Sequence, residues 1–285
     1  GPDAVEGERS GKRDDRWAFT NRDTSLEYLV TVALAAASRV LRGYEDELAD
    51  ECLETALKTW QYEQSREPVE QRSSYVPGQP AVMETLAAAE LLITTGEESY
   101  RQRLLALWPT IQENIPQVGG AITRALPYIK DDAFTAKLRQ SLQDYKATLE
   151  TELSQNPFGI PYRKNIWGIG WLLQGYAVQQ YYLIQTFPDL FERENVLRVV
   201  NYVLGCHPAS NVSLVSGVGA RSQTVAYGVN RADWWYIPGG NISGPTLVEP
   251  DFPELKDSFP FIWQQSEYVI SGAATYIFCI LAPDA

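Results

Sequence analysis

The sequence NYVLGCHP at residues 201–208, followed by VSGVG at 215–219 and WQQSEYVISGAA at 263–274, ends a chain that otherwise has the pattern of helices. Upstream of this stretch, apolar residues recur at a helical period, and the alternation typical of strands is nearly absent. Short polar turns join the helices in consecutive pairs, and no repeat of fixed length is visible. The pattern predicts an all-α protein built as a closed toroid of helical hairpins.

Eight helices are predicted from these periods and from the residues that end them. They span residues 24–41, 45–63, 80–95, 98–115, 131–153, 167–187, 188–204 and 264–281. Gly43, Gly96 and Gly205 end three of them, because glycine accepts the left-handed backbone that closes a helix. Pro109 kinks or ends the fourth. All of residues 1–285 are expected to form a single domain.

A long irregular loop is expected between Cys206 and about Phe261, rich in Gly, Asn and aromatic residues. Its length is about 55 residues, and compact domains seldom keep such a loop unless it builds a site. The loop leads into the last predicted helix, whose first turns carry one carboxylate, Glu267, among apolar and small residues. Burial there would raise the pKa of Glu267 toward that of a general acid. The simpler interpretation is a glutamate stabilised by the helix dipole.

Composition limits the classes of function. The chain has 285 residues, 45% of them hydrophobic, with 8 Trp and 16 Tyr, which suit ligands with apolar faces and hydroxyl rims. The formal net charge of −12 disfavours nucleic acid as a partner but leaves a neutral polymer acceptable. No apolar run reaches the length of about 18 residues expected of a membrane span, and the first residues do not have the pattern of a signal peptide.

Other common chemistries lack support. Cys52, Cys206 and Cys279 form no CxxC pair, so they indicate buried thiols, with one disulfide left open, rather than zinc or redox chemistry. No GxSxG motif is present. The single histidine, His207, is expected to cap a loop rather than to act as a catalyst. The GVG at 217–219 lacks the third glycine and the helix of a dinucleotide fingerprint.

In order and spacing, several segments resemble family 9 glycoside hydrolases. NYVLGCHP resembles that family's Tyr-Ile/Leu-Leu-Gly-x-Asn-Pro segment, and VSGVG resembles its Tyr-Val-x-Gly-x-Gly turn. The Ser-Glu-Tyr that contains Glu267 resembles the Asn-Glu helix bearing the family's catalytic acid. Upstream, NPFGIPYR at 156–163 and WGIG at 167–170 resemble its Gly-Ile-Pro-Tyr and Trp-Gly-x-Gly segments. The Ala-rich helix after Asp23 is also similar, so the resemblance covers most of the chain.

The resemblance implies an (α/α)6 barrel of twelve helices and the inverting hydrolysis of a β-glycosidic bond. Only eight helices are predicted here, so the barrel is expected to be incomplete. The family carries its water-activating base in an Asp-Ala-Gly-Asp-type segment, and this sequence contains no such segment. We therefore expect the C-terminal two-thirds of a catalytic domain, whose base lies on an N-terminal part of the same protein.

By the same resemblance, Glu267 is the general acid, with Ser266 in place of the family's Asn. Arg231 falls at the Arg of the family's His-His-Arg loop and would donate hydrogen bonds to sugar hydroxyls. Val229 and Asn230 replace the two histidines, which puts cellulose itself in doubt as the substrate.

The remaining substrate-binding candidates are one carboxylate and several aromatic residues. Asp257 precedes the acid helix as an Asp does in the family, where it would orient a loop or a substrate hydroxyl. Five aromatic side chains are candidates to stack on sugar rings. They are Trp234, Trp235, Trp263, Tyr162 and Trp167.

The leading hypothesis is an endo-β-glucanase or exo-β-glucosidase that acts on a β-glucan or a related oligosaccharide. A non-catalytic carbohydrate-binding or degenerate toroid is the first alternative, and a polysaccharide lyase, for which only Arg231 is available, is the second. No cofactor or metal ligand set is predicted, although the resembled family often holds structural calcium. The substrate implies a secreted, periplasmic or cell-surface location.

Overall fold

The computed structural model describes residues 21–71, 78–162, 167–207, 211–224, 236–246 and 263–282, with only the backbone described at residue 263. Helices make up most of these residues, and the described part holds no strand, only three isolated β-bridges. The predicted all-α class is therefore confirmed. The chain divides into two compact units, Gly1–Ala87 and Ala88–Ala285, which are described in turn.

The first unit is built on a helical hairpin. α1 (Thr24–Leu41) packs along α2 (Asp46–Gln64), and both lie within one residue of their predicted positions. The Asp23 carboxylate begins α1 by accepting a hydrogen bond of 2.8 Å from the backbone N–H of Leu26. Gly43 has a φ of +86° and follows the end of α1, as the sequence predicts.

A buried carboxylate joins the two ends of this hairpin. Glu63 is 2% exposed and accepts hydrogen bonds from the Arg22 guanidinium at 2.6 and 2.7 Å and from the Thr24 hydroxyl at 2.7 Å. Burial alone would raise the pKa of Glu63, but these donors outweigh it and hold that pKa below the usual range. The start of α1 is thereby fastened to the last turns of α2.

α1 is also long and apolar enough, by length and composition alone, to cross a membrane. Its polar residues face inward, however, since Thr31 and Ser38 are buried in the unit. Their hydroxyls donate to the carbonyls of Glu27 at 3.0 Å and Ala35 at 2.8 Å, within the helix itself. A core helix and a signal sequence near the N-terminus pass the same test; α1 packs along α2, but only 33% of this stretch is buried.

α3 (Pro80–Thr95) contains the boundary between the units, and three shorter helices follow it. They are α4 (Glu98–Ala106), α5 (Trp108–Glu113) and α6 (Ile115–Ile129). The continuous helix predicted over residues 98–115 is therefore wrong, whereas the interruption expected at Pro109 is confirmed. The chain leaves the helical path at Leu107 and Asn114, and a proline lies in the first turn of each following helix, where its missing N–H does no harm.

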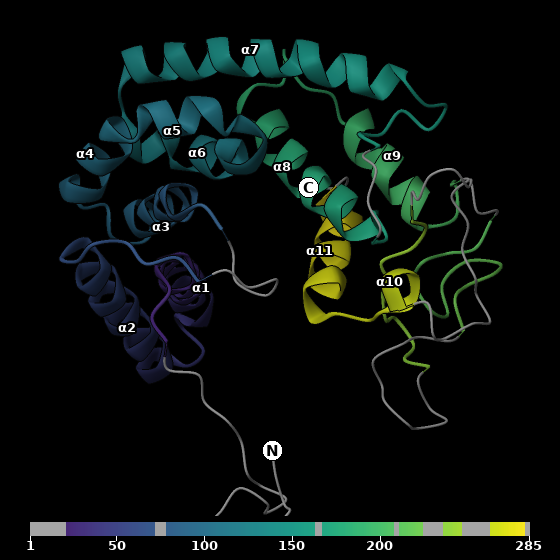
Figure 1. The fold of residues 1–285 in the computed structure, drawn as a ribbon, viewed down its shortest axis with the longest axis horizontal. Helices are drawn as coiled ribbons and strands as arrows, with labels where there is room; N and C mark the ends of the chain where they lie inside the picture. The colour runs from purple at the N-terminus through teal and green to yellow at the C-terminus, as the bar shows by residue number, and fades with distance from the viewer. Residues whose placement is uncertain are drawn as a thin grey trace, which may run out of the picture. The chain divides into compact units, whose positions relative to one another are not determined.

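The second unit centres on α8 (Gly170–Thr186), which contacts α6, α9 (Glu194–Val203) and α11 (Ile270–Leu281). α7 (Asp132–Ser154) packs on α6 (Figure 1). α9 begins six residues later than predicted, because the residues after Pro188 form turns instead of a first helical turn. α10 (Trp263–Ser266) is a single turn before α11.

The core of this unit is shared by helices and loops. Tyr202 of α9 is completely buried, and its ring makes edge-on contacts with Phe158 and Tyr162, with centroids 6.2 Å apart in both pairs. Leu214 and Ile242 come from the predicted loop region and are buried in the same cluster. The described parts of the loop at about 206–261 are thus irregular, as predicted, but well packed.

The three cysteines are free thiols. Cys52 and Cys279 are buried as predicted, whereas Cys206 is exposed, and the disulfide left open by the sequence is not formed. Burial raises the pKa of the Cys279 thiol to about 12. That thiol lies 3.6 Å from the carbonyl oxygen of Gln174, to which it donates.

Candidate active site

Glu267 lies in a break between two helices, not in the first turns of one. α10 ends immediately before it, Tyr268 pairs with Ile242 in an antiparallel bridge, and α11 begins only at Ile270. Val269 has extended backbone angles, with φ −134° and ψ 144°. The continuous helix predicted over residues 264–281 is therefore wrong, because pairing with the 236–246 segment replaces a helical turn at this point.

Two distant segments hold the backbone that leads into this break. The N–H of Gly168 donates to the carbonyl of Gln264 at 2.7 Å, and the N–H of Gly244 donates to the carbonyl of Gln265 at 2.8 Å. The hydroxyl of Ser243 also donates to the Gln264 carbonyl at 2.7 Å. Because Gln264 and Gln265 are fixed from both sides, the position of the candidate acid depends on residues far away in the sequence.

The glycines of the WGIG segment permit this approach. A Cβ atom on Gly168 would lie 2.4 Å from the carbonyl oxygens of Ser243 and Gly244. At Gly170 a Cβ would lie 2.7 Å from the Ser243 oxygen, which accepts a 2.8 Å hydrogen bond from the Gly170 N–H. Only glycine allows the two backbones to lie this close.

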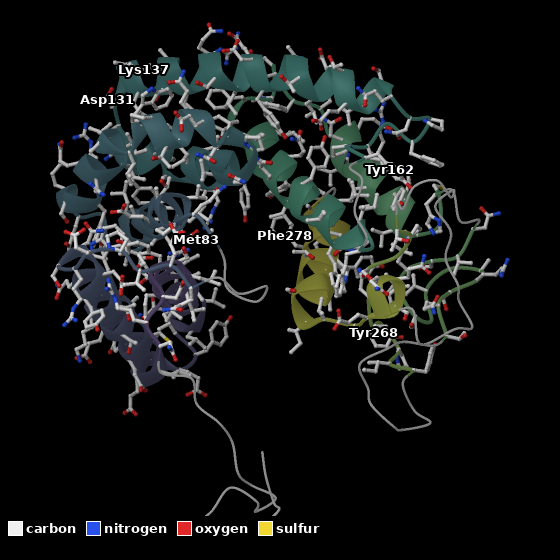
Figure 2. The ribbon with its side chains drawn as sticks, in the orientation of Figure 1. Met83, Asp131, Lys137, Tyr162, Tyr268 and Phe278 are labelled. Carbon is white, nitrogen blue, oxygen red and sulfur yellow. The ribbon has the colours of Figure 1, made fainter. Side chains whose placement is uncertain are left out.

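Tyr268, the residue after the candidate acid (labelled in Figure 2), is anchored through its hydroxyl. The Ser216 hydroxyl donates to the carbonyl of Gln223 at 2.7 Å, so its contact with the Tyr268 hydroxyl uses the tyrosine proton. Burial raises the pKa of Tyr268, which keeps the phenol protonated and able to donate. The ring lies close to Gly240, where a Cβ would come within 2.7 Å of it.

The Glu267 side chain is half-buried. This burial raises the pKa of Glu267 above its ordinary value, because removing water disfavours the charged carboxylate. This upward shift of the Glu267 pKa is the one anticipated from the sequence. A general acid must hold its proton at the working pH, and a raised pKa favours that state.

Most of the predicted binding residues fall outside what the structure describes. Arg231, Trp234, Trp235 and Asp257 lie outside the described residues, and the side chain of Trp263 is likewise not described. Their roles stay predictions. The neighbouring Tyr236 is described and is 41% exposed, which leaves an aromatic surface of this loop accessible.

Tyr162 and Trp167 are described, and they have different settings. The Tyr162 ring packs against Tyr202 in the core, and burial raises the pKa of its phenol. Trp167 is half-buried and immediately precedes Gly168, whose N–H is bonded to Gln264. The backbone bond of Gly168 therefore places Trp167 next to a residue that contacts the segment of Glu267. Tyr162 instead belongs to the packing around α9 (Figure 2).

The single histidine has the loop-capping role predicted for it. His207 is 5% exposed, and its Nε2 lies 2.8 Å from the carbonyl oxygen of Val212, to which it donates. Burial lowers the pKa of the imidazole, so the neutral form is favoured. The ring closes the turn after α9 and stacks at a tilt on Tyr202, with centroids 5.3 Å apart.

Sequence reasoning missed the residues that position the break. Ser216 and Tyr268 lie in segments that carry the family resemblance, but nothing in the sequence joins them to each other or to Ser243, because their roles depend on contacts across long stretches of chain. The WGIG glycines were the available signal, since closely spaced glycines mark a near approach of another backbone. Within the described ranges, no group of three or more His, Cys, Asp and Glu side chains is placed to hold a metal ion.

The sequence matches the family model described as Glycosyl hydrolase family 9 over residues 8–230. A comparison with curated proteins gave no match. Solved structures give close likenesses over almost the whole chain.

Three of these structures illustrate the likeness. AaCel9A in complex with cellobiose-like isofagomine has a TM-score of 0.77 at 17% identity, over 100% of this chain and 59% of that chain. The GH family 9 endoglucanase J30 has a TM-score of 0.77 at 20% identity, over 99% of this chain and 59% of that chain. An endoglucanase from the termite Nasutitermes takasagoensis has a TM-score of 0.69 at 17% identity, over 97% of this chain and 70% of that chain.

At these identities the likeness is one of fold, and it confirms the (α/α)6 barrel class predicted from the sequence. The chain spans 59% of the length of the first two structures.

Proposed function

This chain belongs to glycosyl hydrolase family 9, and from that membership we propose that it supplies the general acid for inverting hydrolysis of a β-glucan. The observation that carries the proposal is the setting of Glu267. Burial raises the pKa of its carboxyl, and backbone bonds from two distant segments hold the residues that lead into it. A proton donor needs both properties, the proton and a fixed position.

In the proposed reaction, Glu267 protonates the glycosidic oxygen as the bond to the anomeric carbon breaks. A second carboxylate removes a proton from water on the opposite face of the ring, about 6.5–9.5 Å from the acid, and the configuration inverts. None of the described carboxylates is assigned to that second role. We propose that the base belongs to another part of the complete catalytic domain.

We further propose endo action on a glucan outside the cytoplasm. The termite protein and J30 are named as endoglucanases, and the lost histidine pair at Val229 and Asn230 leaves the preferred linkage to be measured. Arg231 and the Trp234–Trp235 pair are the proposed sugar contacts of the loop. No cofactor is required by this mechanism, and a structural calcium ion would need ligands that we do not assign.

The decisive experiment is Glu267→Gln in the complete protein, with two substrates. On an unactivated mixed-linkage glucan the rate should fall by about 10²-fold or more, because the leaving oxygen must be protonated. On an aryl glycoside with an acidic phenol as leaving group, the loss should be small. Glu51→Gln, which changes an exposed glutamate of α2, is the matched control. Equal losses on both substrates would contradict the acid role.

Endo action is tested on the same protein. Viscosity of a soluble glucan should fall well before much reducing sugar appears, whereas an exo-β-glucosidase would release glucose from the start. A non-catalytic glucan-binding domain is the second candidate, and the replaced histidine pair favours it. That candidate predicts binding to the glucan with no reducing sugar from either substrate. Family membership gives no support to a lyase.

A further inference from the structure

The helix α11 is apolar on every side. Its sequence, ISGAATYIFCIL, contains no charged residue. A helix that is hydrophobic all round normally belongs to the core of a large protein or spans a membrane. The 12 residues of α11 extend for about 18 Å, which is too short for a hydrocarbon core of about 30 Å. A protein core is therefore the setting that this sequence indicates.

One side of α11 lies in such a core, packed on α8. The Thr275 hydroxyl donates to the side-chain oxygen of Gln174 at 2.8 Å. The ring of Phe278 meets the ring of Tyr181 edge-on, with centroids 5.2 Å apart. These contacts determine which side of α11 faces α8 and which side faces away from it.

The side that faces away carries a row of exposed apolar residues. Ala274, Ile277 and Leu281 follow Ile270 by four, seven and eleven residues, so all four lie on one face of the helix. Ile270 is 91% exposed, Ile277 is 59% exposed and Leu281 is 66% exposed. We call these four residues the α11 stripe. A continuous apolar surface of this kind marks a site of contact with another protein segment.

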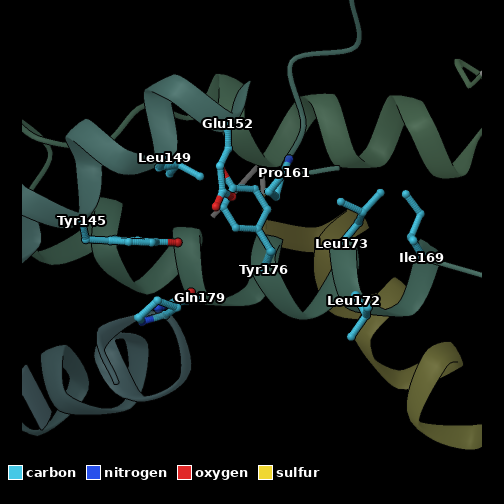
Figure 3. Close-up of a pocket in the computed structure, with 10 residues that line it drawn as sticks. Tyr145, Leu149, Glu152, Pro161, Ile169, Leu172, Leu173, Tyr176 and Gln179 are labelled. Atoms are coloured by element: carbon cyan, nitrogen blue, oxygen red, sulfur yellow. The ribbon is translucent and has the colours of Figure 1, made fainter. Parts of the chain in front are cut away.

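The neighbouring helix α8 has an exposed leucine as well. The close-up of the cavity of about 200 Å³ beside α8 shows Leu172 and Leu173 pointing to opposite sides of the helix (Figure 3). Leu173 is buried, whereas Leu172 is 59% exposed. Exposed apolar side chains therefore occur on both members of the α8–α11 pair.

The length of the chain indicates what covers the α11 stripe. This chain matches AaCel9A over all of its own residues but covers 59% of that chain, so about two fifths of the larger protein has no counterpart here. In a closed toroid of helices each helix has a neighbour on both sides. α11 is the last helix that the structure describes, and it packs on α8 and α9.

We propose that the α11 stripe is the docking surface for an amphipathic helix from the part of the catalytic domain that this chain does not contain. The stripe is uncharged, so a charged group placed against it would lose water without gaining a partner. The docked helix therefore presents an apolar face to α11 and keeps its charges on the other side. The stripe begins three residues after Glu267, so docking also brings that part of the domain beside the candidate acid; only this consequence rests on the proposed function.

The first test is cysteine labelling of the complete protein with Cys206→Ser, which removes the exposed native thiol of this chain. Ile277→Cys in the stripe is compared with Glu51→Cys on the exposed side of α2. Each native rate of alkylation by N-ethylmaleimide is divided by the rate of the same variant in denaturant. Ile277→Cys should react at least about 10-fold more slowly than the control, because a docked helix shields the thiol. Equal normalised rates would show that the stripe is bare and would overturn the proposal.

A second measurement identifies the segment that covers the stripe. Leu281→p-benzoylphenylalanine in the complete protein is irradiated, and the cross-linked peptides are identified by mass spectrometry. A cross-link to a peptide from outside residues 1–285 supports the proposal. Cross-links confined to residues 1–285, or to a second copy of the protein, overturn it. Neither measurement uses hydrolysis, so a protein that labels and cross-links as expected but does not cleave glucan overturns only the proposed function.

Discussion

Gly168→Ala tests whether the approach of the WGIG segment to the 243–244 backbone holds the candidate acid in place. The added Cβ would lie 2.4 Å from the carbonyl oxygens of Ser243 and Gly244, and neither is the end of a flexible side chain that could turn away. One of the two backbones must move. The movement lengthens the 2.7 Å hydrogen bond from the Gly168 N–H to the Gln264 carbonyl. It also lengthens the bonds that the Ser243 hydroxyl donates to the Gln264 carbonyl and the Gly244 N–H donates to the Gln265 carbonyl.

The magnitude follows from these contacts. Forcing an extra methyl group into a packed site costs about 1–3 kcal/mol. Two weakened backbone hydrogen bonds add about 0.5–1.5 kcal/mol each. The free energy of unfolding should therefore fall by about 2–6 kcal/mol. For a unit of this size, about 2–4 °C in Tm corresponds to each kcal/mol, so the expected fall in Tm is about 4–24 °C.

Thermal denaturation followed by circular dichroism measures this fall, and Gly175→Ala is the control. Gly175 lies on the exposed side of α8, with nothing within 4 Å of an added Cβ. There alanine should stabilise the protein by about 0.5–1 kcal/mol, because it lowers the entropy of the unfolded chain and favours the helix. If Gly168→Ala melted at the wild-type temperature or above, the close approach at Gly168 would not be a constraint, and the argument for the fixed acid would fail.

Three further predictions concern single groups. Tyr268→Phe removes the hydroxyl that donates to Ser216 and should lower the free energy of unfolding by about 1 kcal/mol in a denaturant titration; an unchanged midpoint would contradict the anchor. Glu267 has a raised folded-state pKa, so its stabilising contribution is present below its unfolded pKa and is lost as the pH rises through the folded value. The Tm of Glu267→Gln minus that of wild type should accordingly become more positive from pH 4 to pH 7, and a flat difference would refute this. Cys206 should react with a thiol reagent in the native protein while the two buried thiols react only after unfolding; three fast thiols would show that the burial is wrong.

The helices with simple patterns could be predicted from the sequence. α1, α2, α3 and α7 lie within one residue of the predicted bounds, and in α1 and α7 the capping residues Asp23 and Asp131 agree with the apolar periodicity. Gly43, Gly96 and Gly205 have positive φ, as expected of residues that end helices. Local signals were sufficient in these segments.

The errors lie where tertiary contacts outweigh local signals. No helix was predicted for the residues after Pro116, yet α6 runs from Ile115 to Ile129. Gly119 and Gly120 discourage an isolated helix, but here they allow close packing on Gln179, whose atoms lie 3.2 Å from the Cβ that either glycine would carry. The break at Glu267 was missed for the same reason, since its partner Ile242 is distant in sequence.

The setting of Glu267 in the structure bears on the two interpretations that the sequence left open, and the acid role stays a proposal. A glutamate in the first turn of a helix is stabilised as a carboxylate by the helix dipole, which would lower its pKa. Glu267 instead precedes the first residue of α11, with the extended Val269 between them, and the dipole falls off within the first turn. Its pKa is raised, and burial is the cause. The direction of that shift is opposite to the effect of a helix start and agrees with a carboxyl that keeps its proton for transfer.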